Sequence, residues 1–218
     1  MQTSAARHSE ELANAMSHGL GLVASLAALP VLIIVGLQRG DELAALGAAI
    51  FGVALLSVYV TSTVYHALPP GAAKDRWRRL DHAAIYILIA GTYTPFSLGA
   101  LRGPIGWTLL GVVWAAALTG AAVKIFFFVS RRLQRLSTAT YLALGWMALL
   151  VFEPLLARVG WAGLGWLFAG GLAYTLGVIF FSCDERIRFG HCVWHFFVLG
   201  GSVCHAVAVV AYGVTVPR

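Results

Sequence analysis

Two pairs of polar residues lie one helical turn apart in sequence that is otherwise mostly apolar. His191 and His195 are four residues apart, as are Ser62 and His66, so in helices each pair lies on one face. Two imidazoles at this spacing can bind a single metal ion, and His66 offers a third nitrogen. Three histidines and a water form the ligand set of a catalytic zinc site. The sequence therefore predicts a Zn²⁺ site made by His66, His191 and His195.

A carboxylate, Asp81, is available to bind or orient the water of such a site and to accept its proton. Other interpretations remain open. A histidine near a helix end can be neutral and simply hydrogen-bonded. Asp81 could form an ion pair with Arg78 or Arg79, and Ser62 could donate its hydroxyl to a carbonyl of its own helix.

The composition shows what kind of elements must position these residues. The chain has 218 residues, of which 60% are hydrophobic and 11% charged, whereas soluble domains carry about 25% charge. It is therefore predicted to be an integral membrane protein. A spanning helix needs about 20 apolar residues, so the whole chain, 1–218, forms a single membrane domain with no room for a second globular one. The net charge of +6 is spread over loops and does not indicate nucleic-acid binding.

Seven apolar runs are long enough to be spanning helices. The first run is too long for the apolar core of a signal peptide, so we expect it to stay as a span. The predicted spans are 19–37, 43–68, 83–100, 105–129, 138–157, 161–182 and 192–216.

The basic residues predict the orientation of these spans. Eleven of the fifteen Lys and Arg fall on the side of the N-terminus, and four fall on the opposite side. The positive-inside rule then places the N-terminus in the cytoplasm and the C-terminus outside, in a seven-transmembrane-helix, all-α bundle of the cell membrane. The eleven are Arg7, Lys74, Arg76, Arg78, Arg79, Lys124, Arg131, Arg132, Arg135, Arg186 and Arg188, and the four are Arg39, Arg102, Arg158 and Arg218.

This topology brings the polar residues to one depth in the membrane. Spans two, three and seven each meet the cytoplasmic side near His66, Asp81 and His191, respectively. His205 is ten residues beyond His195, which puts it about 15 Å deeper along the helix, so we do not expect it to be a ligand. The predicted metal site therefore lies in the cytoplasmic leaflet.

Residues 8–214 resemble the hemolysin III family, the bacterial branch of the progestin-and-adipoQ receptors, and four ordered motifs carry the resemblance. They are the stretches 11–19, 62–66, 81–95 and 191–205. The resemblance implies zinc bound by His66, His191 and His195, with Asp81 near the zinc-bound water and Ser62 close behind the ligands. Asp81 and Ser62 are thus the candidate catalytic residues. The wider superfamily includes alkaline ceramidases, which implies hydrolysis of lipid amides.

These observations favour a zinc-dependent hydrolase of acyl lipids, amide or ester, involved in membrane lipid homeostasis, with membrane lipids as its partners. Two other classes remain open. As a sensor of the membrane, the protein would use zinc to hold its spans together while a lipid shifts its conformation. As a channel or proton path, it would use His205 and Ser202 as a relay along span seven.

Overall fold

The computed structural model describes residues 4–127, 131–184 and 186–216, and side chains from residue 7 onward except 128–135, 185 and 217–218. The described chain is helical and contains no strand, as predicted. Arg131, Arg132, Arg135 and Arg218, which contribute to the predicted orientation, lie outside the described side chains. The elements are α1 (Ser4–Arg39), α2 (Glu42–Ala67), α3 (Ala72–Leu98), α4 (Pro104–Phe126), α5 (Arg131–Gly145), the 3₁₀ helix η1 (Trp146–Val151), α6 (Phe152–Ser182), α7 (Gly190–Ala208) and the π-helical turn η2 (Val209–Gly213).

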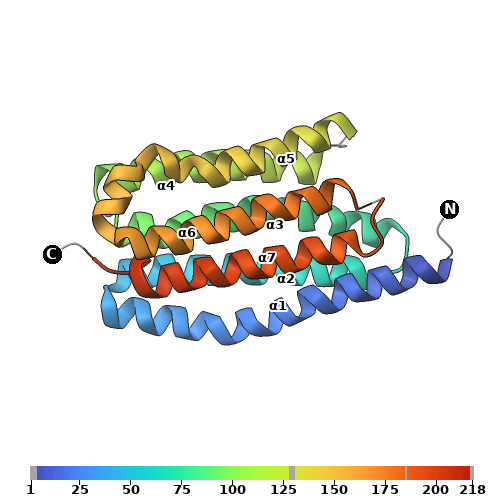
Figure 1. Ribbon diagram of the computed structural model, residues 1–218, viewed down its shortest axis with the longest axis horizontal. Coiled ribbons are helices and arrows are strands. Elements are labelled where there is room, and N and C mark those ends of the chain that lie inside the picture. Colours follow the sequence, from blue (N-terminus) through green and yellow to red (C-terminus); the bar gives the residue numbers. More distant parts are fainter. Residues whose placement is uncertain (1–3, 128–130, 185, 217–218) are drawn as a thin grey trace.

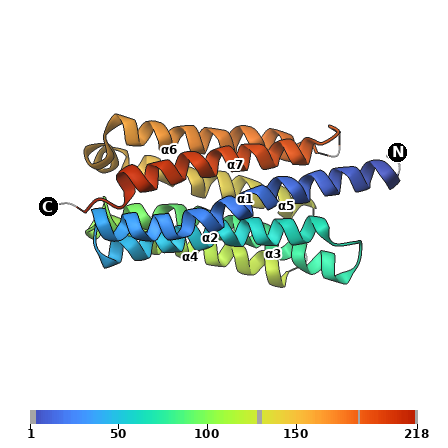
Figure 2. The same cartoon turned by 90° about the horizontal axis from the view of Figure 1, so that it is seen from below.

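The helices form a bundle along one long axis, with the two chain termini at opposite ends (Figure 1). The start of α1, the α2–α3 linker and the α6–α7 linker lie together at the end that we call the N-terminal end. The largest interfaces are those of α2 with α1 and α3, of α3 with α4 and of α6 with α7, and α7 also packs on α1 (Figure 2). The last long helix therefore lies beside the first.

Five helical stretches are long and apolar enough to cross a membrane: Arg7–Arg39, Glu42–Ala67, Pro104–Phe126, Leu136–Ser182 and Gly190–Gly213. Large apolar side chains on them face outward, as Leu20, Val23 and Leu26 do on α1. A bilayer is the solvent that suits such a surface. The protein is thus a multi-pass membrane protein.

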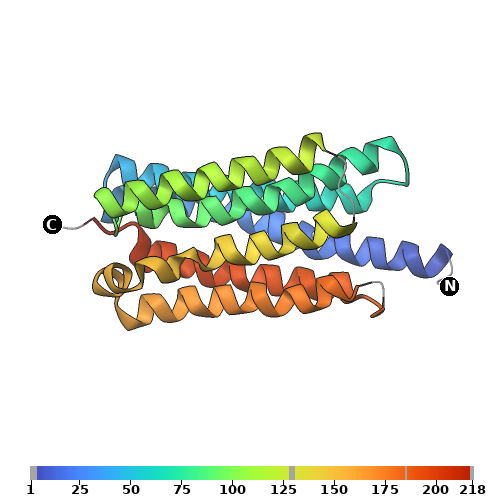
Figure 3. The same ribbon diagram turned by 90° about the horizontal axis from the view of Figure 1, so that it is seen from above.

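Two of the predicted spans, 83–100 on α3 and 138–157, do not appear as separate stretches among these five. α3 carries buried polar residues such as Thr92, Thr94 and Ser97, which lower its hydropathy while it occupies the middle of the bundle. The stretch Leu136–Ser182 is continuous helix by hydrogen bonding but turns at Gly160, whose φ of 64° is left-handed. Figure 3 shows that the chain reverses direction between α5 and the long part of α6, through a short helical stretch seen end-on. Gly160 therefore lies at the boundary that the sequence placed between 157 and 161.

α1 is longer than the predicted span 19–37. The helix begins at Ser4, which adds about four turns before residue 19. Residues Glu11, Asn14 and His18 are spaced by three and four, and share one face of these turns. This face of α1 points to the centre of the N-terminal end, where Asn14 and His18 are buried.

Close packing of α2 on α3 depends on small residues. A Cβ atom at Gly91 would lie 2.5 Å from the Cβ of Ala54, and one at Gly47 would lie 2.9 Å from the Cα of Pro95. Small residues allow membrane helices to approach closely, since lipid offers no hydrophobic driving force for their association. This contact fixes the position of α3, which carries Asp81, against α2, which carries His66.

The opposite end of the bundle is held by an ion pair between two linkers. Arg102 donates two hydrogen bonds to the carboxylate of Asp41, at 2.5 and 2.7 Å. Asp41 also accepts from the backbone N–H groups of Leu43 and Ala44 and so caps α2. The Arg102 guanidinium and these N–H groups hold the pKa of Asp41 well below its usual range. The pair ties the α1–α2 linker to the α3–α4 linker.

Candidate metal centre

Three histidines meet at the N-terminal end of the bundle. His191 and His195 lie one turn apart at the start of α7, and His66 lies in the last turn of α2. One ligand nitrogen of each lies within 4.8 Å of those of the other two. His66 and His195 are buried and His191 is half-buried. The structure therefore brings together the three residues predicted as ligands, close enough to bind one metal ion.

Hydrogen bonds determine which nitrogen of each ring is free. His66 Nδ1 lies 2.9 Å from a carboxylate oxygen of Glu11, and His191 Nδ1 lies 3.0 Å from one of Asp184. A carboxylate accepts hydrogen bonds, so both rings carry their proton on Nδ1. Their Nε2 atoms are left as bare acceptors.

The same reasoning applies to His195. Its Nδ1 lies 2.8 Å from Ser17 Oγ and 3.2 Å from the carbonyl oxygen of Asn14. Ser17 already donates its hydroxyl proton to Asn14 O, so Ser17 can only accept from His195. His195 therefore also carries its proton on Nδ1.

The three rings bring ligand nitrogens within 4.8 Å of one another, and the Nε2 atom of His66 is buried with no hydrogen-bond partner among the described residues. Acceptors placed in this way repel one another unless a cation or donor lies between them. Neutral histidines whose Nδ1–H groups donate to carboxylates or carbonyls are the usual ligands of zinc in proteins. The donor set therefore fits a metal ion.

Sequence reasoning assigned no role to the residues that hold these rings. Glu11, Asn14 and Ser17 come from the part of α1 that precedes the predicted span 19–37, although their stretch was among the motifs of the family resemblance. Glu11 also accepts from Lys74 Nζ at 2.9 Å. The spacing of Glu11 to His18 along one helix face was the signal that could have identified them.

Asp184 was also missed. It lies in the short linker between α6 and α7, seven residues before the histidine that it contacts, and because this linker is not an α-helix the two residues do not share a helix face. The linker turns sharply at Phe189, whose φ is 58°. This turn brings the Asp184 carboxylate back to the start of α7, a contact that sequence spacing does not indicate.

Asp81 and Ser62 lie in the wall of a cavity that reaches the histidines. Two alternative interpretations of them were wrong. Asp81 forms no ion pair with the described arginines, because Arg78 approaches Asp75 and Arg79 donates to the carbonyl of Ile125. Ser62 Oγ is buried and makes no hydrogen bond within its own helix, and it interacts with the carboxylate of Asp81. The catalytic roles of Asp81 and Ser62 stay predictions.

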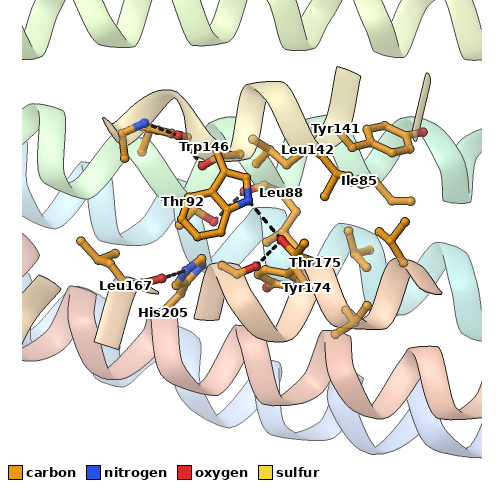
Figure 4. A pocket seen from close by; sticks show the side chains of 18 of the residues that line it. Ile85, Leu88, Thr92, Tyr141, Leu142, Trp146, Leu167, Tyr174, Thr175 and His205 are labelled. Atoms are coloured by element: carbon orange, nitrogen blue, oxygen red, sulfur yellow. Dashed lines mark hydrogen bonds between the residues drawn. The ribbon is translucent and has the colours of Figure 1, made fainter. Parts of the chain in front are cut away.

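The cavity extends from the histidines along α3. Its wall includes Asp81, Ile85, Leu88, Thr92 and Phe96, and the fifteen helical steps from Asp81 to Phe96 correspond to about 22 Å. The remaining wall comes mainly from apolar side chains of α5, α6 and α7, several of which Figure 4 shows. The space is therefore long, mainly apolar, and polar at the histidine end.

The polar residues of α7 that lie farther from the three histidines, Ser202 and His205, form hydrogen bonds with other helices. Ser202 Oγ accepts from Tyr59 at 2.8 Å and bonds to Tyr174 at 2.9 Å. His205 Nε2 donates to the carbonyl of Leu167 (Figure 4). Within the described part of the chain no hydrogen bond joins His205 to His195, so nothing in these contacts favours a relay along α7.

An all-helical multi-pass membrane protein with three histidines that could hold a metal ion is the class that this fold and site define. Within that class the chain belongs to the hemolysin III family. The family model described as haemolysin-III related matches residues 6–206. The resemblance inferred from the motifs is thus confirmed.

Individual relatives agree with this assignment. The chain is 45% identical to the hemolysin-3 homolog of Bacillus subtilis (strain 168), over 95% of this chain and 96% of that protein. It is 42% identical to hemolysin-3 of Bacillus cereus, over 93% and 91% of the two chains. It is 29% identical to the human monocyte to macrophage differentiation factor, over 75% of this chain and 68% of that protein.

Proposed function

We propose that the chain is a zinc-dependent hydrolase that cleaves an amide or ester bond of membrane lipids. The observation that carries the proposal is the set of three Nδ1-protonated histidines at one end of a long apolar cavity, with Asp81 in the same cavity wall. All-nitrogen donor sets of this kind suit zinc. Three protein ligands are one fewer than a tetrahedral ion takes, which is the pattern of catalytic rather than structural zinc sites.

Zinc at this position would activate a water molecule near neutral pH and polarise a carbonyl group. The residues of the chain supply the remaining parts. Asp81 is the one carboxylate in the described cavity wall, and it accepts a proton from the attacking water. The hydroxyl of Ser62, four residues before His66, interacts with Asp81 and is placed to orient that carboxylate or the water.

The cavity indicates the class of substrate. An apolar space of about 22 Å along α3 suits an acyl chain, whose carbonyl group would then lie near the histidines. A soluble peptide would leave this apolar wall uncovered. Membrane lipids are therefore the proposed partners.

In the membrane we propose seven crossings, with the N-terminus in the cytoplasm. The turn at Gly160 divides the Leu136–Ser182 stretch into two antiparallel passes, and α3 adds another to the five apolar stretches. With the eleven-to-four bias of basic residues, the histidine end then lies in the cytoplasmic leaflet.

The test is the Asp81→Asn variant. Asparagine has the same shape but cannot accept the proton, so zinc content and melting temperature should be retained. Release of free fatty acid from a panel of acyl amides and esters should fall about 10²–10⁴-fold. Asp75→Asn is the matched control, because Asp75 is exposed on the same helix and lies outside the cavity wall. Its activity should equal that of the wild type.

Wild-type protein that holds zinc but releases no fatty acid from any lipid of the panel would contradict the hydrolase. That result would favour the sensor, in which the same metal joins α2 to α7 without turnover.

A further inference from the structure

His18 on α1 is a buried polar residue with no assigned task. Only 3% of its surface is exposed, and it lines the cavity that contains Asp81. Both of its ring nitrogens are buried without a hydrogen-bond partner among the described residues. One turn earlier on the same face, the side-chain oxygen of Asn14 is also buried without a hydrogen-bond partner among the described residues.

This arrangement is unfavourable for the protein by itself. A neutral imidazole carries one donor and one acceptor whichever nitrogen is protonated, so two groups lose their hydrogen bonds to water on folding. Buried polar groups in native proteins are nearly always paired, and an unpaired one needs an explanation. A phenyl ring would fill the same space with no such cost.

The contacts of the ring hold it directly beside the metal centre. It stacks on the ring of His195, with centroids 3.5 Å apart and planes inclined by 14°. The edge of Tyr59 packs against it, at 5.1 Å and 86°. His18 is not a member of the three-histidine group, since only His66, His191 and His195 bring ligand atoms within 4.8 Å of one another. The ring is thus fixed beside a ligand without being one.

We propose that His18 binds the polar head of the lipid that enters the cavity, by donating a hydrogen bond from a ring nitrogen to the carbonyl oxygen of an acyl group. The proposal rests on the proposed function for the class of ligand. It makes His18 a specificity-determining residue, which selects acyl lipids with a carbonyl group at the histidine end. The missing partner of the imidazole is then supplied by the ligand.

The variant His18→Phe separates this role from a structural one. Phenylalanine keeps an aromatic ring to stack on His195 and removes both unpartnered nitrogens. Zinc content should stay unchanged, and the melting temperature should equal or exceed that of the wild type. Palmitate binding to the zinc-loaded protein should weaken about tenfold, the loss of one hydrogen bond in a dry site.

Two further variants complete the experiment. His18→Gln restores a donor and an acceptor and should recover part of the palmitate affinity. Ser25→Ala lies two turns along α1, outside the cavity wall, and should bind palmitate as the wild type does. Both are measured in the same detergent with the same zinc loading.

The possible results separate the two proposals. Wild-type protein that binds palmitate but cleaves no lipid would contradict the hydrolase and leave the role of His18 intact. Palmitate affinity that is equal in wild type and His18→Phe, or wild type that does not bind palmitate, would overturn the role of His18. A fall in melting temperature or zinc content in both His18 variants would also overturn it, because the residue would then be structural.

Discussion

Removal of the Glu11 side chain should weaken metal binding although Glu11 is not a ligand. Glu11 is the one described acceptor for the Nδ1–H of His66, at 2.9 Å, and it accepts from Lys74 at the same distance. In Glu11→Ala the buried Nδ1–H loses its partner, and the ring is free to turn its Nε2 away from the other two histidines. Loss of such a supporting carboxylate typically costs 10–100-fold in metal affinity, or about 1.4–2.8 kcal/mol.

The structure also predicts the order of three related variants. Asp184→Ala should match Glu11→Ala, because His191 depends on Asp184 as its described acceptor in the same way. Ser17→Ala should cost less, since the carbonyl of Asn14 stays 3.2 Å from His195 Nδ1 and can accept the same proton. Glu42→Ala, exposed at the start of α2 and at the other end of the bundle, should have no effect.

The assay is titration of the metal-free protein with zinc in mild detergent, against a chelating dye of known affinity. Glu11→Ala that binds zinc within twofold of the wild type would refute the reasoning, and so would a larger loss from Ser17→Ala than from Glu11→Ala.

Three further predictions concern the fold. A reporter enzyme that works only in the cytoplasm should be active when fused after Lys74, and one that works only outside should be active at the C-terminus; the reverse pattern would contradict the proposed orientation. Asp41→Asn should reduce thermal stability at neutral pH, and the difference from wild type should vanish in acid. Because the pKa of Asp41 is lowered in the folded chain, its ionised carboxylate stabilises the fold above the ordinary aspartate range near pH 4, and this stabilisation is lost as the pH falls below that range. A difference in melting temperature that persists in strong acid would contradict this. Gly91→Leu should destabilise the protein by about 1–3 kcal/mol, because a Cβ atom at residue 91 would lie 2.5 Å from the Cβ of Ala54. An unchanged melting temperature would contradict this and show that α2 and α3 can move apart at little cost.

The ligand set and the helical class were predictable because both follow from spacing. His191 and His195 share a face wherever the helix that carries them begins. A chain this apolar lies in a membrane, where only α-helices or a closed β-barrel satisfy the hydrogen bonds of the backbone, and its long apolar runs favour helices. Strong periodic signals of this kind do not depend on how the helices pack. The three histidines therefore met as expected, although the boundaries of several helices differed.

The residues that support the ligands were not predictable in the same way. Glu11 and Ser17 lie in sequence too polar to be recognised as part of a span, and only tertiary packing of α1 on α2 and α7 brings them to His66 and His195, respectively. Asp184 depends on the left-handed turn at Phe189, which no simple turn signal marks, since Phe rarely adopts it. Interactions between distant helices were decisive in each case.

The measurement that tests the central claim most directly is the metal content of the purified protein. One zinc per chain is expected for the wild type in mild detergent. His191→Ala should lose most of it, whereas His205→Ala should keep it, because His205 donates to the carbonyl of Leu167 and lies outside the three-histidine group. Wild-type protein without metal, or equal loss of zinc from both variants, would contradict the assignment of the metal centre.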